Sequence, residues 1–410
     1  MKNNRLVAAL ATALFAACAE GPTEFTPITE LPRPLTASEQ EVITASNTFA
    51  FELFREINAS EPGANVFISP LSASMALGMT LNGARGETFD AMRGTLGFEG
   101  LTQHEVNASY RGLIDLLRGL DPQVEMLIGN SIWYRDPFPF HQAFFDTTSA
   151  YFDARVAGLD FTDPASVNVI NDWVKESTDG KIESVLDRIE PDDVMYLINA
   201  IYFKGDWTRQ FDKQDTRDAP FYDGEGEQVV ATIPMMHRRG PLLHARGPNF
   251  QAADLPYGNT AFSMMVILPD IGVPVDDVIA SLDPQRWRDL TEDFSEANLE
   301  IYLPKFRLEY AKNLNDVLIA LGMGPAFDPR VADFNGMSPL GDALYISRVF
   351  QQTYVYVNEA GTEAAAATSV GVGVVSLPPI FRVDRPFIFA IRERFSGTIL
   401  FIGTVVQPAR

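Results

Sequence analysis

Histidines, nucleophiles and carboxylates carry out most protein chemistry, and in this 410-residue chain they form no catalytic pattern. None of its four histidines stands at a spacing typical of metal ligands: His104, His141, His237 and His244. His104-Glu105 resembles the start of a zinc-binding helix, but no second histidine follows at the required offset. The chain also lacks a G-x-S-x-G nucleophile motif and a phosphate-binding glycine loop. We therefore predict that it is not an enzyme and that it uses no metal or cofactor.

The only cysteine, Cys18, stands at the end of an N-terminal export signal. A positively charged start is followed by the uncharged run Leu6–Phe15, which is too short to span a membrane as a helix. Residues 14–18 (LFAAC) resemble a bacterial lipobox, in which the cysteine becomes the lipidated first residue. We expect residues 1–17 to be a signal peptide and Cys18 to carry a lipid in the bacterial cell envelope, on the periplasmic or the surface face of the outer membrane. The alternative is ordinary cleavage after Ala19 and secretion.

Charge and composition limit the partners of the chain. With 54 acidic and 32 basic residues, its formal charge is −22. A nucleic-acid binder needs clustered Lys and Arg to replace counterions, so this class is excluded. A hydrophobic content of 46% with 29 Phe residues predicts a large folded core.

An unusual segment near the C-terminus has the composition of a strand that could be added to an existing β-sheet. Gly361–Leu377 (GTEAAAATSVGVGVVSL) holds no charge after Glu363. Read with the period of a strand, it has one face that can be buried: Thr362, Ala364, Ala366, Thr368, Val370, Val372 and Val374. The other face is small and weakly polar: Glu363, Ala365, Ala367, Ser369, Gly371 and Gly373. Composition alone also allows an Ala-rich helix or a flexible loop.

The elements around this segment indicate one α+β domain of residues 38–410. Residues 18–37, rich in proline, are expected to be a flexible tether that follows the lipidated cysteine. Ser38–Glu41 reads as the capping box of the first helix. Further helices are predicted over 168–176 and 314–321. Runs of Val, Ile, Tyr and Phe predict strands over 194–203, 262–268, 299–306 and 349–357.

Several stretches in the right order resemble the serpin family, the serine protease inhibitors. Val357–Thr368 (VNEAGTEAAAAT) resembles the serpin hinge almost residue for residue, and Phe381–Ile391 resembles the signature that follows the reactive loop. Phe401–Pro408 resembles the C-terminal strand of the family. Earlier stretches fit too: Asn65–Pro70, Asn171–Ile182, Asn199–Trp207 and Leu303–Phe306. The chain is thus identified as a member of this family, in a form similar to a bacterial lipoprotein.

The resemblance implies the serpin fold and a reactive bond. The fold has a large, mostly antiparallel central sheet, further sheets, about eight or nine helices and an exposed reactive-centre loop. Fourteen residues on from Gly361 lies Val375, and ten residues back from Pro386 lies Ser376, so the two counts agree on the bond Val375–Ser376. Val374 leaves a slip of one residue open.

The resemblance also assigns the residues that let the cut loop enter the sheet. Gly361 is expected to adopt the backbone angles of the turn, and Thr362 to enter the sheet first. Small side chains follow at a low cost in side-chain entropy. The hinge assigned in this way contains Glu359, Gly361, Thr362, Glu363, Ala364, Ala365, Ala366, Ala367 and Thr368.

A second group of residues is implied at the place where the sheet parts. By resemblance, the shutter and breach contain Ser69, Ser72, Asn199, Trp207 and Lys305. Lys305 is expected to pair with Glu359. Two positions depart from the family pattern, because Gln351 stands where serpins usually have a shutter histidine and Ala360 replaces a charged residue.

The predicted function is suicide-substrate inhibition of a serine protease, by acylation at Val375 and loop insertion. A β-branched, medium-sized residue suits the aliphatic primary pocket of an elastase- or subtilisin-like enzyme. The alternative is a non-inhibitory serpin that acts as a surface-anchored binding protein or a simple substrate. Gly371 and Gly373 favour it, because a flexible loop can be cut faster than it inserts. We expect a monomer that binds no nucleic acid. A heparin-type cofactor is not expected either, because residues 107–120, which match the helix that binds heparin in some serpins, offer only Arg111 and Arg118 as basic residues.

Overall fold

The computed structural model describes residues 26–190, 193–362 and 378–408. Within these ranges it contains nine α-helices. They are α1 (Ala37–Ser60), α2 (Pro70–Leu81), α3 (Gly86–Thr95), α4 (Gln103–Gly119), α5 (Gln142–Phe152), α6 (Ala165–Ser177), α7 (Val275–Ser281), α8 (Pro284–Glu292) and α9 (Asn315–Leu318). None of the helices in the described ranges combines the length and the apolar content that crossing a membrane requires.

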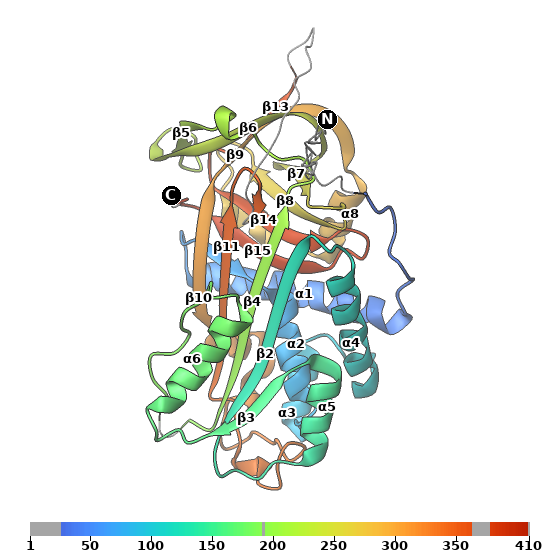
Figure 1. Cartoon of the computed structure of the whole chain (residues 1–410), viewed down its shortest axis with the longest axis vertical. Coiled ribbons are helices and arrows are strands. Elements are labelled where there is room, and N and C mark those ends of the chain that lie inside the picture. The colour runs from blue at the N-terminus through green and yellow to red at the C-terminus, as the bar shows by residue number, and fades with distance from the viewer. Residues whose placement is uncertain (1–25, 191–192, 363–377, 409–410) are drawn as a thin grey trace, which may run out of the picture.

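A six-stranded sheet runs along the long axis of the molecule (Figure 1). Its order is β10 (Phe306–Asn313), β11 (Arg348–Val357), β12 (Gly361–Thr362), β4 (Met195–Asp206), β2 (Val124–Arg135) and β3 (Arg155–Leu159). The short β12 lies between β11 and β4 at one end and is antiparallel to both. Beyond β12, β11 and β4 pair directly and in parallel.

A second sheet of nine strands packs behind and above the first (Figure 1). Its path is β1 (Val66–Ile68), β15 (Ile399–Val405), β14 (Phe387–Glu393), β8 (Phe262–Pro269), β7 (Phe250–Pro256), β6 (Val229–Arg246), β9 (Ser295–Pro304) and β13 (Ile380–Arg382). The ninth strand, β5 (Arg217–Tyr222), pairs with β6. The two sheets and nine helices of the described residues confirm the predicted α+β fold, and the six-stranded sheet is mostly antiparallel as predicted, with parallel pairs only between β11 and β4 and between β2 and β3.

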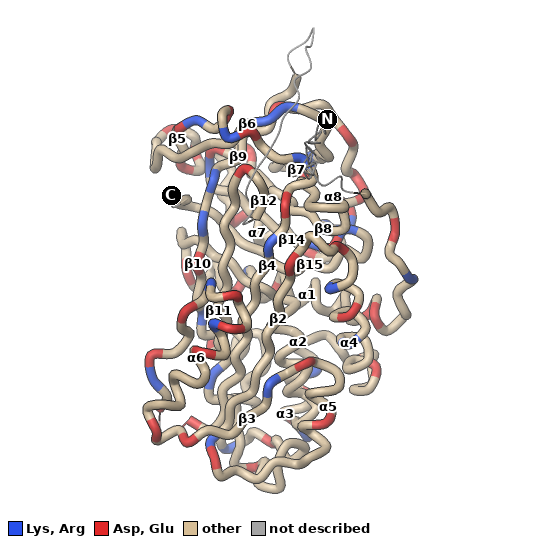
Figure 2. The backbone as a smooth tube through the Cα atoms, viewed as in Figure 1, with Lys and Arg blue, Asp and Glu red and all other residues tan. Residues whose placement is uncertain are grey.

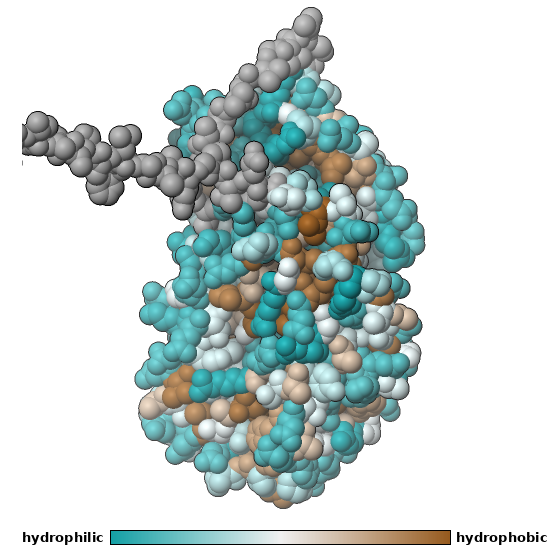
Figure 3. Space-filling model, turned by 45° about the vertical axis from the view of Figure 1, so that its right-hand side comes forward, coloured by the Kyte–Doolittle hydropathy of each residue, from teal (hydrophilic) through white to brown (hydrophobic). Residues whose placement is uncertain are grey.

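Two hydrophobic clusters hold these layers together. The larger joins the two sheets with α1 and α2, and a smaller one lies under α6, where Trp133, Ile170 and Tyr196 are all completely buried. Figure 2 shows acidic residues spread over the molecule, with Lys and Arg also distributed along its length, among other places near β5, β6, β10 and α6. The face turned forward in Figure 3 is largely hydrophilic, with hydrophobic side chains gathered in its upper half.

The predicted elements are present, with three differences in detail. The predicted strand over 299–306 is divided at Lys305, where β9 ends and β10 begins. The predicted helix over 314–321 continues from α9 as a wider turn to Met323. The capping box of the first helix was placed wrongly, because Thr36 and Glu39 form it instead of Ser38 and Glu41.

The part of the predicted tether that the structure describes lies against the body of the protein. Ile28 donates its backbone N–H to the Asn259 carbonyl oxygen at 2.9 Å. Arg33 binds the Glu39 carboxylate with both terminal nitrogens, at 2.6 and 2.8 Å. Residues 26–36 therefore contribute contacts to the fold before the first helix begins.

Candidate functional site

The hinge begins with a tight turn between β11 and β12. The side-chain oxygen of Asn358 accepts the backbone N–H groups of Ala360 at 2.9 Å and Gly361 at 3.3 Å. The Asn358 N–H donates to the Gly361 carbonyl oxygen at 2.9 Å. This asparagine closes the turn that sends the chain back into the six-stranded sheet.

Gly361 is required by close packing rather than by its backbone angles. Its φ does not lie in the left-handed region, so the expected reason for a glycine at this position was wrong. A Cβ atom on Gly361 would lie 2.1 Å from the Gly205 carbonyl oxygen of β4, closer than any real contact. Any other residue would push β12 away from β4.

Thr362 is completely buried at the end of the sheet. Its hydroxyl lies 2.9 Å from the Tyr257 hydroxyl, and burial raises the pKa of Tyr257. Tyr257 in turn stacks on Trp207, with ring centroids 4.4 Å apart and an interplanar angle of 11°. The expected first residue of insertion therefore already occupies a place in the sheet.

The segment after β4 holds the hinge turn from the other side. The Trp207 backbone N–H donates to the Ala360 carbonyl oxygen at 2.8 Å, and its indole N–H donates to the Asn358 carbonyl oxygen at 2.9 Å. The Phe211 N–H donates to the Glu359 carbonyl oxygen at 2.8 Å. The Ala360 side chain is completely buried, which is a physical reason for the loss of a charge here.

Glu359 is bound at the top of the sheet by Lys305 and Thr216. Lys305 Nζ lies 2.9 Å from Glu359 Oε2, and the Thr216 hydroxyl donates to Glu359 Oε1 at 2.8 Å. Burial favours protonation of this carboxyl, but the hydrogen bonds from Lys305, from its own backbone N–H and from Thr216 lower its pKa. Glu359 is therefore ionised at neutral pH.

Gln351 connects β11 and β4 in the middle of the six-stranded sheet. It lies on β11 directly opposite Asn199 of β4 in the parallel pairing. Its amide accepts from the Ser69 N–H at 2.9 Å, donates to the Ser69 carbonyl oxygen at 2.8 Å and donates to Asn199 Oδ1 at 3.0 Å. An amide thus makes three hydrogen bonds across the contact between β11, β4 and the start of α2.

The other predicted shutter residues complete this network. The Asn199 amide nitrogen donates to the Ser72 hydroxyl and, at 2.8 Å, to Asn130 Oδ1. The Ser69 hydroxyl donates to the Leu400 carbonyl oxygen at 2.7 Å. We call Ser69, Ser72, Asn130, Asn199 and Gln351 the shutter network, and all five are buried.

The remaining predicted residues lie outside the described residues. They are Cys18, Glu363, Ala364, Ala365, Ala366, Ala367, Thr368, Val375 and Ser376. Sequence reasoning missed four residues of the site that the structure adds: Asn130, Thr216, Tyr257 and Asn358. Only Asn358 stood within a recognised motif, whereas the others reach the site through strand pairing or loop contacts.

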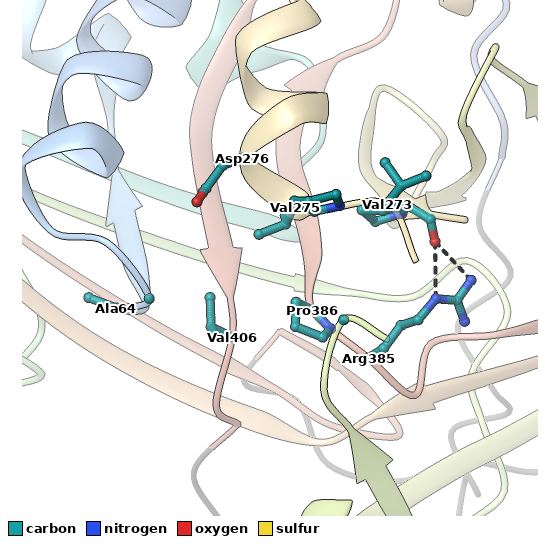
Figure 4. Close-up of a pocket in the computed structure, with 11 residues that line it drawn as sticks. Ala64, Val273, Val275, Asp276, Arg385, Pro386 and Val406 are labelled. Atoms are coloured by element: carbon teal, nitrogen blue, oxygen red, sulfur yellow. Dashed lines mark hydrogen bonds between the residues drawn. The ribbon is translucent and has the colours of Figure 1, made fainter. Parts of the chain in front are cut away.

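Two other features of the structure lie apart from the hinge and shutter. A cavity of about 230 Å³ between α7 and the start of β14 is lined mostly by glycine, proline and valine. Arg385 at its edge binds the Pro269 carbonyl oxygen through two nitrogens, at 2.8 and 3.0 Å (Figure 4).

On α4, Arg111 and Arg118 both pair with Asp153 at 2.7 Å. Within the described residues, no three His, Cys, Asp or Glu side chains are grouped as metal ligands.

Comparisons with known proteins give a consistent result over nearly the whole chain. A family profile described as Serpin (serine protease inhibitor) matches residues 44–408. The chain is 34% identical over 395 residues to "Serpin B11" of Homo sapiens, covering 89% of this chain and 99% of that protein. It is 35% identical over 384 residues to the "Leukocyte elastase inhibitor" of Sus scrofa, covering 90% and 100%. The solved native structure of tengpin, a thermophilic serpin, matches with a TM-score of 0.83 and 33% identity, covering 94% of this chain and 97% of tengpin.

Proposed function

Because this chain belongs to the serpin family of serine protease inhibitors, we propose that it is a suicide-substrate inhibitor of an elastase- or subtilisin-like protease. The observation that carries the proposal is β12, two residues of the hinge held between β11 and β4. Thr362 pairs with Val357 of β11 and with Gly205 of β4. Gly361 and Thr362 are therefore already paired in the register that an inserted strand would continue.

Continuing the register of β12 gives the place of each following residue after cleavage. Each step along the inserting chain moves one residue back along β11 and one back along β4. Thr368 would then lie between Gln351 and Asn199, which are partners of each other in the uncut protein. The inserting strand would thus enter the shutter network and break the hydrogen bond from the Gln351 amide to Asn199 Oδ1.

The two faces of the inserting segment suit the two sides of the sheet. Thr368 shares a face with the buried Thr362 and would point toward the shutter network. The opposite face lies toward α6, where Tyr196, Ile198 and Ala200 of β4 are already closely packed. Only small side chains fit there without moving α6, which agrees with the residues on that face: Ala365, Ala367, Ser369 and Gly371.

Insertion exchanges one ladder of hydrogen bonds for two. Over Arg348–Tyr354, β11 pairs in parallel with β4. A strand between them, antiparallel to both like β12, replaces this ladder by two antiparallel ones, which are slightly more stable per residue. Each added hydrogen bond contributes roughly 0.5–1.5 kcal/mol net, so the cut form is the more stable one.

The proposed chemistry is that of a normal protease substrate stopped at its covalent intermediate. The serine hydroxyl oxygen of the protease attacks the Val375 carbonyl carbon, and the bond to the Ser376 nitrogen breaks. The amine of Ser376 leaves with a proton, and Val375 remains joined to the protease as an ester. Insertion then withdraws this ester before water can hydrolyse it.

Replacing the residue before the bond is expected to change the target. Val375→Arg should form a covalent complex with trypsin that is stable on a denaturing gel, because a trypsin-like pocket binds a positive charge. The unaltered protein should form such a complex with pancreatic elastase. Val374→Arg is the matched control for a slip of one residue. If it, and not Val375→Arg, reacted with trypsin, the bond would be Val374–Val375.

The same gel separates inhibition from the alternative function. A cleaved product without any covalent complex, at every ratio of protease to protein, would favour a non-inhibitory substrate or binding protein. Gly371 and Gly373 are the residues that favour this outcome, because flexible residues slow the ordering of the inserting strand.

We also propose that the mature protein is anchored to the cell envelope through Cys18. The carrying observation is the short apolar run directly before this single cysteine. Cys18→Ala should move the protein from the membrane pellet to the soluble fraction after cell disruption. Equal amounts of both proteins in the pellet would contradict a lipid anchor at this residue.

A further inference from the structure

Two arginines meet beside the hinge without a carboxylate. Arg209 lies in the segment between Trp207 and Phe211, and Arg238 lies on β6. The Arg238 guanidinium carbon is 5.2 Å from the centre of the Phe211 ring. A Cβ atom on Gly240, two residues on along the same face of β6, would lie 3.7 Å from Arg209 Nη1. The side chain of Arg209 thus lies on the face of β6 that carries Arg238, close enough for its charge to act on Arg238.

Neither arginine has the partner that a charged group normally finds. Neither arginine forms an ion pair within the described residues. This is unexpected in a chain that has 54 acidic residues and only 32 basic ones. Arg238 Nε is shielded from solvent and has no hydrogen-bond partner there. Burial, and next the charge of Arg209, lower the pKa of Arg238 to about 10, so it is still charged at neutral pH. Two like charges side by side are unfavourable unless an anion joins them.

Other arginines of this protein show what such groups usually bind. Arg33, Arg118 and Arg392 each contact a carboxylate within 3.1 Å. The carboxylate of the hinge, Glu359, is already bound by Lys305 and Thr216. A guanidinium pair has donors in a fork geometry that matches the oxygen atoms of a planar or tetrahedral oxyanion.

We propose that Arg209 and Arg238 form a binding site for a small oxyanion of the phosphate, sulfate or carboxylate class. The anion bridges the two guanidinium groups and neutralises their mutual repulsion. The aromatic ring of Phe211 forms one wall of the site and supports the Arg238 guanidinium by a cation–π contact. This site contains none of the residues assigned to the hinge, the shutter or the reactive bond, and its proposal does not depend on protease inhibition.

The position of the site couples it to the hinge. Arg209 lies between Trp207, which binds the Ala360 carbonyl oxygen, and Phe211, which binds the Glu359 carbonyl oxygen. An anion that links Arg209 to β6 therefore also fixes the segment Trp207–Phe211, which binds the hinge turn. Binding therefore stabilises the arrangement in which Gly361 and Thr362 lie in the sheet.

Calorimetric titration of the intact protein with sodium phosphate tests the proposal without any protease. Chloride keeps the ionic strength constant, and a parallel titration with acetate distinguishes a tetrahedral anion from a carboxylate. Saturable binding of one anion per chain is expected. Arg209→Ala and Arg238→Ala should each weaken it about tenfold or more, because each removes hydrogen bonds to a charged group.

The controls separate this site from general electrostatics. Arg382→Ala removes a charge at the same end of the molecule, where the guanidinium carbon lies 3.6 Å from the centre of the Tyr302 ring, and should leave phosphate binding unchanged. The exposed Arg209 is the variant least able to disturb folding. Equal phosphate affinity in the unaltered protein and the Arg209→Ala protein would overturn the proposal, as would a non-saturating response to phosphate and acetate. Failure of inhibition would leave these results unaffected.

Discussion

Thr362→Arg is expected to convert the inhibitor into a substrate. Thr362 is completely buried beside Tyr257, with no room or partner for a charge at this position. Burying an unpaired guanidinium costs several kcal/mol, so β12 should leave the sheet and insertion after cleavage should slow. The covalent ester is then hydrolysed before it is withdrawn. On a denaturing gel with elastase, the ratio of covalent complex to cleaved product should fall about tenfold or more.

Thr362→Ser is the matched control for this experiment. Serine keeps the hydroxyl that contacts Tyr257 and adds no bulk, so the ratio of complex to product should stay close to that of the unaltered protein. If Thr362→Arg formed as much complex as Thr362→Ser, insertion would not begin at β12, and the proposed mechanism would be refuted.

Gln351→Leu is expected to shorten the life of the intact form. It removes three hydrogen bonds and leaves the Ser69 N–H and the Asn199 side-chain oxygen without this partner in a buried place. Each unsatisfied buried group costs about 1–3 kcal/mol. At a fixed temperature, the loss of inhibitory activity with time should accelerate about tenfold. Gln352→Leu is the control, since Gln352 is also buried but faces away from the shutter network.

Gln351→His should make the same loss of activity depend on pH. Glutamine does not titrate, so for the unaltered shutter network we expect a flat profile between about pH 5.5 and 8. The network contains no carboxylate, and burial disfavours a charged imidazole, which lowers its pKa in the folded state below about 6.5. The stability that the neutral imidazole contributes is therefore lost as the pH falls through that lowered value, and inactivation accelerates. A flat profile for the variant would show that this position does not control the opening.

Local sequence was sufficient for most of the elements, whereas the family resemblance was needed to assign the hinge. The alternation of residues after Gly361, the apolar runs of the strands and the order of the motifs all depend on neighbours in the chain. Such patterns persist because strand and helix periods are local properties of the backbone. The family resemblance added the expected roles of Ser69, Ser72 and Asn199. The capping box was misplaced by two residues, because both Thr36 and Ser38 satisfy the same short pattern.

Tertiary structure decided what depends on residues far apart in the chain. Gly361 is needed because the Gly205 carbonyl oxygen lies where a side chain would begin, which no local rule for turns reveals. Gln351 replaces a histidine without breaking the network because its amide can both accept from and donate to Ser69. The approach of Arg209 to Arg238 depends on how one loop lies over β6.

The reactive bond and the strand that would carry it illustrate the same division. The bond Val375–Ser376 stays a prediction from the sequence, made by counting along the chain from two motifs that resemble those of the family. Only the structure gives the register between β12, β11 and β4, on which the proposed place of Thr368 between Gln351 and Asn199 in the cut form depends. Register is a relation between strands, and a shift of one residue would turn every side chain to the other face of the sheet.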